Sequence, residues 1–374
     1  MSQVSSRVSN RVSIVVPAYN AEPYINECLD SLCKQTLRDI EIICVNDGST
    51  DKTAELIADY AQKDERIVLI NQPNHGVGAA RNAGMQAATG GIIMLCDADD
   101  TLCFNACELV AQRFEDTSAQ VVTFAFTTIA STPAATADFS ETDVHPVLKQ
   151  AMDMRDAVLD NTPQSVIALL FKENARPFGA RIALTAEFMR THNIHWDEGL
   201  TLGDDQFFCF EIYPRSQRTV LMSQQLYCYR MHETSMTHTS VILPQQLLDK
   251  LYKHLACEEA ILKDWKQGQF LGLCDERLIE WCIELVLFDV SKLDQSAQQQ
   301  FWNDWKQRVL SYIAVPQLLH SPRLAPYAKS CLKDICSRQA MVSKRHLSMF
   351  YLRQRGLINS IKRVVWGLSQ KAKE

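Results

Sequence analysis

Four short apolar runs in the N-terminal part of the chain constrain its fold more than any other feature. They are rich in β-branched residues and lie at 12–16, 40–45, 67–70 and 92–96. A strand buried on both faces of a parallel sheet needs this composition. Apolar residues recur at helical spacing between the first two runs, after Pro23, which suits a helix start. The alternation predicts an α/β fold with parallel strands and flanking helices.

Polar loops follow three of these runs where each strand is expected to end. They are Pro17-Ala18-Tyr19-Asn20, the segment 46–51, and Asp97-Ala98-Asp99-Asp100. Because ligands bind outside the carboxyl ends of strands in open α/β sheets, these loops should converge on one crevice. Two carboxylates one residue apart can reach the same ion, and oxygen ligands suit Mg²⁺ or Mn²⁺ that also binds phosphates. For Asp47 or Asp99 alone, simple strand ending or helix capping is the alternative.

Together, four segments resemble the nucleotide-binding half of a family 2 glycosyltransferase with a GT-A fold: 12–20, 45–51, 74–84 and 97–100. The resemblance continues through 203–205 and 227–230 but leaves the C-terminal part of the chain unexplained. It implies a Rossmann-like mixed, mainly parallel sheet. It also implies metal-dependent, inverting transfer of a sugar from a UDP-sugar to a hydroxyl of a glycan or lipid-linked acceptor. The context would be synthesis of a bacterial capsule, lipopolysaccharide or exopolysaccharide.

The resemblance also implies roles for the acids at 97–100. Asp99 is the first choice as ligand of a divalent metal, Mn²⁺ or Mg²⁺. Asp97 is expected to share contacts with the metal or the ribose, and Asp100 to orient the other two.

Residues around the nucleotide follow from the same resemblance. Asp47 corresponds to the position that accepts the N3 hydrogen of uracil, which cytosine lacks, so a carboxylate there favours UDP. Pro17, Tyr19 and Asn20 are expected to line the base and ribose, with the Tyr19 ring available for stacking. Arg81 can meet the diphosphate as a planar donor, and a salt bridge at a helix start is its open alternative.

The acceptor hydroxyl is a weak acid, so a positioned carboxylate must take its proton during attack. The resemblance implies Asp205 as this base and Asp204 as its neighbour and fallback, although Glu is commoner than Asp at 204. One base and one direct displacement predict inversion at the anomeric carbon. Candidates for diphosphate or acceptor contacts are His232, Arg230 and Trp196. A structural role for His232 and core packing for Trp196 remain alternatives.

With 374 residues, 47% of them hydrophobic, the chain is longer than one hydrophobic core usually supports. A Thr-, Ala-, Ser- and Pro-rich stretch, 127–146, is predicted to be a loop. The expected regions are a polar tail at 1–11, a catalytic domain at 12–243 with a nucleotide-binding half at 12–126 and an acceptor half at 127–243, and a helical region at 244–374.

The net charge of −6 conceals a basic tail at 329–374, which has eleven Lys and Arg against two acidic residues. Within it, 357–368 places apolar residues at helical spacing beside basic ones, as in a helix on an anionic membrane. Docking on the acidic body of the same protein is the alternative, and nucleic acid is not an expected partner because that body is acidic.

Several absences point to one compartment. The start of the chain has no apolar leader core, no apolar run is long enough to span a bilayer, and the thirteen cysteines form no paired metal motif. We therefore expect a cytoplasmic protein, peripheral on the membrane face if the tail binds lipid.

Two other functions would use a similar fold. A sugar-nucleotide nucleotidyltransferase needs a Gly-rich phosphate loop directly after the first strand, and 16–20 lacks one. A catalytically silent glycan-binding or scaffold protein would lose the acids, and here both acidic segments are present.

Overall fold

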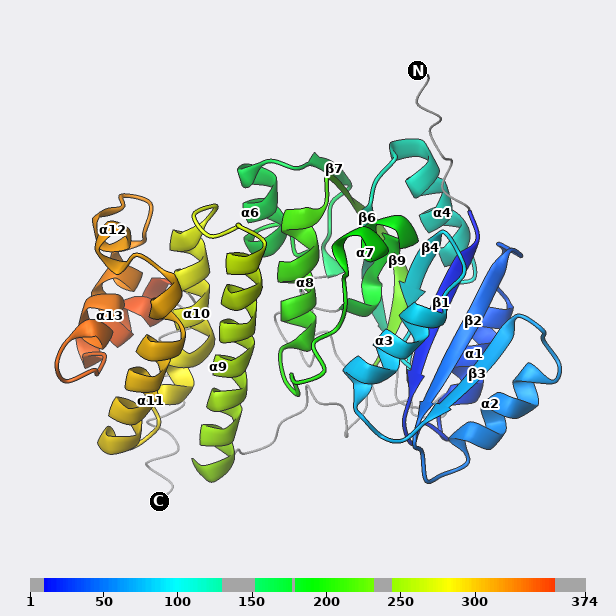
Figure 1. Cartoon of the computed structure of the whole chain (residues 1–374), viewed down its shortest axis with the longest axis horizontal. Coiled ribbons are helices and arrows are strands. Elements are labelled where there is room, and N and C mark those ends of the chain that lie inside the picture. Colours follow the sequence, from blue (N-terminus) through cyan, green and yellow to red (C-terminus); the bar gives the residue numbers. More distant parts are fainter. Residues whose placement is uncertain (1–9, 130–151, 177–178, 232–243, 354–374) are drawn as a thin grey trace. The chain divides into compact units, whose positions relative to one another are not determined.

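Within the residues described by the computed structural model (10–129, 152–176, 179–231 and 244–353), nine strands form one mixed sheet (Figure 1). The strand order is β3-β2-β1-β4-β8-β6-β9-β5, and β7 pairs with β9 beside this path. The strands are β1 (Val12–Ala18), β2 (Ile40–Asp47), β3 (Ile67–Gln72), β4 (Ile92–Leu95), β5 (Thr101–Leu102), β6 (Val121–Ile129), β7 (Ala157–Asp160), β8 (Ile182–Thr185) and β9 (Arg218–Arg230).

The four predicted runs form parallel strands. β1 pairs in parallel with β2 and β4, and β2 pairs in parallel with β3. Every residue of β1 and β2 is buried, as the continuous apolar runs predicted. β1 continues through Pro17, where the sequence suggests a stop. The ladder tolerates this proline because pairing with β4 ends at Val15, so the missing amide hydrogen is needed on one side at most.

The remaining strands make the sheet mixed. β6 pairs in parallel with β9, whereas β4–β8, β6–β8, β5–β9 and β7–β9 are shorter antiparallel pairings. One detail of the predicted 127–146 loop is wrong, because Thr127–Ile129 continue β6 opposite Cys228–Arg230 of β9. The backbone partners of Thr127–Ile129 come from β9, about 100 positions later in the chain, so the local sequence does not indicate them. Residues 130–146 lie outside the described residues.

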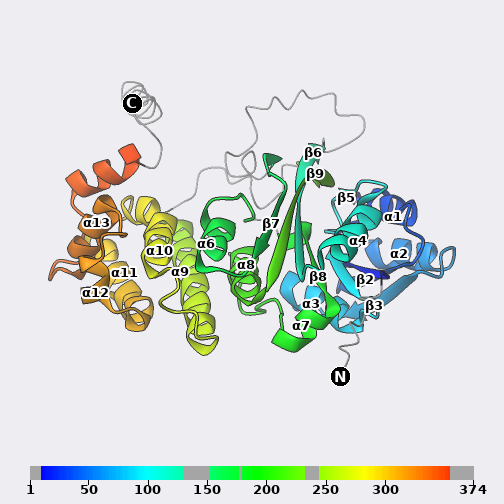
Figure 2. The ribbon, with the colours of Figure 1, turned by 90° about the horizontal axis from the view of Figure 1, so that it is seen from above.

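Helices cover both faces of the sheet, with α3 and α7 on one face and α1 and α4 on the other (Figure 2). This is the layering expected of an α/β sheet. The helices of this unit are α1 (Ile25–Cys33), α2 (Thr53–Ala61), α3 (Val77–Ala87), α4 (Ala106–Thr117), α6 (Pro163–Phe171), α7 (Ala186–His192) and α8 (Asp204–Arg215), with a 3-10 turn at Gly179–Arg181.

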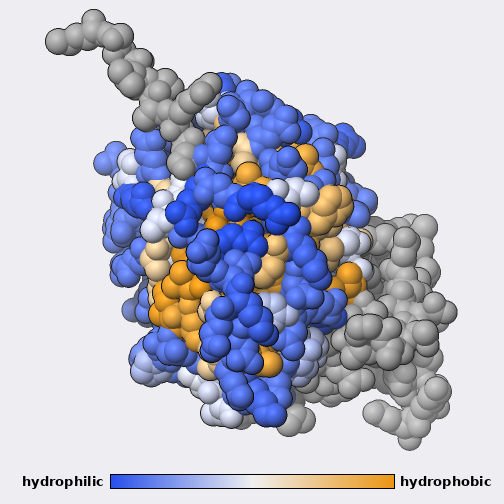
Figure 3. Space-filling view, turned by 90° about the vertical axis from the view of Figure 1, so that its right-hand side faces the viewer, coloured by the Kyte–Doolittle hydropathy of each residue, from blue (hydrophilic) through white to orange (hydrophobic). Residues whose placement is uncertain are grey.

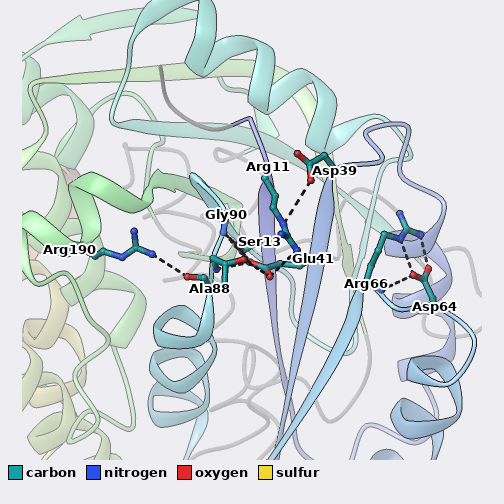
Figure 4. Close-up of polar contacts among 10 residues, drawn as sticks. Arg11, Ser13, Asp39, Glu41, Asp64, Arg66, Ala88, Gly90 and Arg190 are labelled. Carbon is teal, nitrogen blue, oxygen red and sulfur yellow. Dashed lines mark hydrogen bonds and ion pairs between the residues drawn. The ribbon is translucent and has the colours of Figure 1, made fainter. Parts of the chain in front are cut away.

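A buried carboxylate ties the amino-terminal ends of the parallel strands together (Figure 4). Glu41 of β2 accepts hydrogen bonds from the Ser13 hydroxyl (2.5 Å) and from the amides of Thr89 (2.7 Å) and Gly90 (3.0 Å), and Arg11 Nη2 lies 3.3 Å away. Burial opposes the charge on Glu41, but the hydrogen bonds from Ser13, Thr89 and Gly90 outweigh it and lower its pKa. The carboxylate is therefore a structural clamp between β1, β2 and the start of β4.

β3 forms one edge of the sheet. Its Val68 is exposed to solvent, although the strand contains no charged residue. The surface on this side of the molecule is mainly hydrophilic and exposes hydrophobic residues only in limited areas (Figure 3). The edge is thus set in mostly polar surroundings.

The chain divides into two compact units, Met1–Val241 and Ile242–Glu374. In its described part, the second unit contains α9 (Pro244–Gln267), α10 (Asp275–Val290), α11 (Gln295–Arg308), α12 (Val315–His320), α13 (Pro326–Cys336) and the 3-10 turn Leu310–Tyr312, and 344–353 is also helical. Its core is aromatic: Trp265, Trp302 and Trp305 are buried, and Trp305 Nε1 donates to Glu258 at 2.7 Å. Among the described helices, none combines the length and the hydropathy that crossing a bilayer requires.

Candidate functional site

The segment Asp97–Asp100, here called the acidic loop, leaves the carboxyl end of β4 and is held by β9. Asp100 is buried and accepts hydrogen bonds from the Tyr227 hydroxyl (2.5 Å) and the Arg230 amide (2.7 Å). The Tyr227 oxygen also accepts from the Asp97 amide at 3.2 Å. Burial and then the charges of Asp99 and Asp97 raise the pKa of Asp100. The loop therefore places three carboxyl groups close together and is held in place by donors from β9.

Arg230 holds the same loop through its side chain. Its Nε donates to the Asp99 carbonyl at 2.7 Å, and its Nη2 lies 2.6 Å from Glu27. The side chain is only 2% exposed. Although Arg230 was a candidate for diphosphate contact, the structure commits its guanidinium to supporting the loop.

Arg81 connects the acidic loop with the predicted base segment, which lies 123 positions further along the chain. Its guanidinium lies 3.0 Å from both Asp97 and Asp204. Burial disfavours its charge, but the carboxylates of Asp97, Asp205 and Asp204 outweigh burial and raise its pKa. The salt-bridge alternative thus describes Arg81 in this structure, and the residue brings the two acidic segments into one site.

Asp205 lies in the first turn of α8, directly after Asp204, where the helix dipole favours negative charge. Its Oδ1 accepts a hydrogen bond from the Gly179 amide at 2.9 Å. Burial and the neighbouring Asp204 charge raise the pKa of Asp205 to about 6, against the opposing effects of Arg81 and Gly179. A carboxylate with this pKa is ionised at neutral pH and is a stronger base than an ordinary aspartate.

Gly179 supports Asp205 in a way that the sequence does not reveal. A Cβ atom here would lie 2.2 Å from Trp196 Cη2 and 3.0 Å from Asp205 Oδ1, so only glycine fits. The contacts that demand glycine come from Trp196 and Asp205, which lie later in the chain, so the residues around position 179 give no sign of them. Pro177 and Phe178 lie outside the described residues.

Trp196 is part of the support for this site. Its ring is fully buried between the Arg81 guanidinium, 4.1 Å from the ring centroid, and the Phe208 ring, stacked at 4.3 Å. Asn82 fixes its backbone with two hydrogen bonds, one from each partner, of 2.9 and 2.8 Å. Core packing is therefore what the structure shows for Trp196, and neither ring face is open to a sugar.

The loop after β1 meets the loop after β2. Asn20, at a positive φ of 49°, accepts from the Thr50 amide at 2.8 Å, and its own amide donates to the Ser49 hydroxyl at 3.1 Å. Pro17 is buried within β1, whereas Tyr19 is 52% exposed. Of these three predicted nucleotide contacts, Tyr19 presents the most accessible surface for stacking.

Asp47 organises the turn that leads into α3. The buried carboxylate accepts from Gln72 Nε2 (2.8 Å) and from the amides of His75 (3.0 Å) and Gly76 (2.8 Å). Gly76 has a positive φ of 93°, which favours glycine. Any contact of Asp47 with a base would share a carboxylate that already serves the fold.

His232 lies outside the described residues.

A divalent metal at the acidic loop would need oxygen ligands from Asp97 and Asp99. The parts of the chain that the structure describes contain no group of three His, Cys, Asp or Glu side chains able to hold one. However, Asp97 and Asp99 are both partly exposed, and Mg²⁺ or Mn²⁺ in phosphate-transfer sites is often held by one or two carboxylates with substrate oxygens and water. The donor set fits a metal whose coordination is completed by the substrate.

Comparisons with known proteins agree with this geometry. Residues 13–176 match the family model Glycosyl transferase family 2. The described fold resembles S. aureus TarS 1–349 with a TM-score of 0.66 and 17% identity, covering 93% of this chain and 92% of that one, and a complex of the same protein with UDP-GlcNAc gives 0.63. The fold is therefore that of the GT-A glycosyltransferases.

Curated relatives of the chain include proteins named as glycosyltransferases. It is 34% identical over 228 residues to the uncharacterized glycosyltransferase EpsJ of Bacillus subtilis, covering 60% of this chain and 62% of EpsJ. Glycosyltransferase GlyA of Streptococcus pneumoniae is 26% identical over 288 residues, covering 72% of this chain and 40% of GlyA. The chain thus spans less than two thirds of these relatives. Within it, residues 13–176 are similar to glycosyl transferase family 2.

Proposed function

We propose that this chain is a metal-dependent, inverting glycosyltransferase that moves a sugar from a UDP-sugar to a hydroxyl of a glycan or lipid-linked acceptor. The observation that carries the proposal is Asp205, a carboxylate with its pKa raised to about 6 and oriented by the Gly179 amide. Arg81 joins its segment to the acidic loop. A base and a candidate diphosphate site therefore lie in one connected network.

Asp205 would accept the proton of the acceptor hydroxyl as its oxygen attacks the anomeric carbon and the bond to the diphosphate breaks. Asp99, with Asp97, would hold the divalent metal, which supplies Lewis-acid neutralisation of the departing diphosphate. The helix start at α8 and the Arg81 bridge keep the acids from repelling each other out of position. One base and one displacement support inversion.

The donor is proposed to be a UDP-sugar. The TarS structure with UDP-GlcNAc shows that a protein of this fold binds such a donor. Tyr19 offers an exposed ring for base stacking, and the family resemblance assigns the choice of uracil to Asp47. UDP with Mn²⁺ should raise the melting temperature more than CDP with Mn²⁺, because a ligand that binds only the folded state stabilises it. Equal stabilisation by the two nucleotides would remove the role of Asp47 in base choice.

The acceptor is proposed to be a cell-surface polysaccharide or its lipid-linked precursor. Relatives named chondroitin synthase and poly(ribitol-phosphate) beta-glucosyltransferase match shorter parts of the chain, at 42% and 45% identity. We also propose that the basic tail at 329–374, of which 354–374 lie outside the described residues, brings the enzyme to the cytoplasmic membrane face. Removing 357–374 should release the protein from anionic vesicles and spare transfer to a soluble acceptor; unchanged vesicle binding would exclude this role.

The decisive experiment replaces the base and its neighbour separately. Asp205→Asn should keep UDP binding but lose transfer by about 10²–10⁴-fold, the usual contribution of general-base catalysis, because the amide keeps the size but cannot accept the proton. Asp204→Asn is the matched control and should be milder. Transfer is measured with a panel of UDP-sugars and a soluble acceptor analogue.

The outcomes separate the alternatives. If Asp204→Asn is inactive and Asp205→Asn is active, the base is Asp204. If both variants retain full transfer, the inverting mechanism is wrong. Production of a sugar nucleotide from a sugar phosphate would instead indicate a nucleotidyltransferase, and donor binding without any transfer by the unmodified protein would indicate a silent binding protein.

A further inference from the structure

Two cysteines face each other across the strands that hold the acidic loop. Cys103 directly follows β5, and Cys228 lies in β9 opposite Thr101. Their sulfur atoms are 3.8 Å apart, and both residues are partly exposed. The Cys103 thiol also lies 3.1 Å from the Gln225 carbonyl. The pair is close enough for the two sulfurs to meet after side-chain rotation and a small backbone shift.

A second pair in the same unit provides a comparison. The sulfurs of Cys28 and Cys96 are 3.9 Å apart, but both residues are fully buried. The hydrogen bond between Cys96 and Cys28, together with burial, raises the pKa of Cys96 well above its usual value. By contrast, the hydrogen bond from Cys228 lowers the pKa of Cys103 to about 7. Since thiol reactivity requires both access and thiolate, the two pairs should differ although their separations match.

We propose that Cys103 and Cys228 form a reversible disulfide on exposure to small-molecule disulfides, and that this bond controls the acidic loop. The oxidant is a low-molecular-weight disulfide, RSSR. The Cys103 thiolate attacks one sulfur of RSSR, forming a mixed disulfide and releasing RS⁻. Cys228 then loses its proton and attacks the Cys103 sulfur, which releases the second RS⁻. Overall, two protein thiols are oxidised to one disulfide, and RSSR is reduced to two RSH.

The connection to the acidic loop comes from the residues beside Cys228. Tyr227 bonds to Asp100 and to the Asp97 amide, and Arg230 bonds to Asp100 and to the Asp99 carbonyl. A disulfide brings its sulfurs to about 2.05 Å, so Cys228 and Cys103 must move towards each other. That movement acts on the strand that carries Tyr227 and Arg230. The oxidised protein should therefore hold the acidic loop differently from the reduced protein.

The first test detects the bond itself. The full chain is incubated folded with oxidised glutathione, free thiols are alkylated, and peptides are sequenced by fragment-ion mass spectrometry. We expect a Cys103–Cys228 cross-link that dithiothreitol removes and that is absent from Cys103→Ser and Cys228→Ser. Cys28 and Cys96 should remain free thiols until the protein is unfolded. If Cys103 and Cys228 stay reduced, or each only binds glutathione, the proposal is overturned.

The second test measures the loop without any ligand. Amide hydrogen exchange of peptides covering 97–102 and 226–230 should change on oxidation of the unmodified protein and not in Cys103→Ser. Unchanged exchange in a protein that carries the cross-link would overturn control of the loop.

The effect on donor binding rests on the proposed function. Stabilisation by UDP and Mn²⁺ should fall on oxidation and return with dithiothreitol, whereas Cys103→Ser should keep it under both conditions. If the reduced protein shows no stabilisation by UDP, the proposed donor is wrong, while the cross-link and the exchange data still decide the fate of the disulfide proposal. Full stabilisation of the oxidised protein would overturn the link to donor binding.

Discussion

The two ends of the parallel sheet use carboxylates in opposite ways. At the amino-terminal end, Glu41 is surrounded by hydroxyl and amide donors with one partly exposed arginine nearby, and its pKa is lowered. At the carboxyl-terminal end, Asp100 and Asp205 sit beside other carboxylates, and their pKa values are raised. Burial acts in the same direction on all three. The difference lies in the neighbours, which are mostly donors in one case and like charges in the other.

The comparison shows how to separate a structural acid from a functional one. Glu41 gains from ionising in the folded protein, so its charge helps to hold the fold together. Ionisation of Asp205 lowers the stability of the folded protein, because its folded pKa is raised. The same raised pKa would suit the proposed role of Asp205 as a base. Perturbed acids of the second kind gather at functional sites. Predictions about the two ends should therefore separate stability from activity.

The largest effect is expected from the metal position. Asp99→Ala should abolish metal-dependent transfer and leave the fold intact, since the metal in the proposed mechanism would stabilise the leaving group by several kcal/mol. Turnover is measured with Mn²⁺ and with EDTA. Asp39→Ala, an exposed acid at the other end of the sheet, is the control and should behave like the unmodified protein. Full turnover of Asp99→Ala in EDTA would remove the metal assignment.

The next largest effect concerns stability alone. Glu41→Ala should destabilise the protein by about 3 kcal/mol, because several buried donors lose their acceptor at once, whereas Glu41→Gln should be milder. Because the folded pKa of Glu41 is lowered, its ionic contribution is present above the ordinary pKa of Glu and is lost as pH falls through the folded value. Urea unfolding and transfer per folded molecule are the measurements. If Glu41→Ala lost transfer but kept its stability, Glu41 would act in function and not in structure. The contrast between the two ends of the sheet would then be wrong.

A smaller effect of opposite sign is expected at the base. The folded pKa of Asp205, about 6, exceeds the ordinary 3.8, so ionisation costs stability as pH rises through this window. Asp205→Asn removes that cost and should stabilise the protein at pH 7.5 by on the order of 1 kcal/mol, after allowance for solvent screening. Melting temperatures at acidic and neutral pH provide the measurement. A variant less stable than the unmodified protein at neutral pH would show that the carboxylate is structural.

The smallest effect tests the charge coupling within the site. In the proposed mechanism Asp205 acts in its ionised form, so kcat/KM should fall as pH falls through about 6. The Asp204 charge contributes to raising that pKa, and Asp204→Asn should therefore move the acidic limb of the profile to lower pH. The pH dependence of kcat/KM for both proteins is the measurement. An unchanged or higher midpoint would mean that Asp204 does not set the pKa of the base.

Much of the fold could be predicted because its signals are local. Continuous β-branched runs identified the parallel strands, and the polar residues after them marked where these strands end. The errors were also informative. Pro17 continues β1 because the neighbouring β4 ladder has already ended, and Thr127–Ile129 are strand because β9 lies alongside. Both depend on partners that are distant in sequence.

By itself, the sequence determined the order of the elements and the residue types at the ends of the strands, because apolar periodicity and turn chemistry are encoded within a few positions. Only the tertiary structure decided which carboxylates became charged neighbours. Arg81 pairs with Asp97 and with Asp204, which lies 123 positions after Arg81, and Trp196 is buried against that bridge. Electrostatic energies and pKa values depend on distances of a few ångströms between side chains, and these distances exist only after the chain has folded.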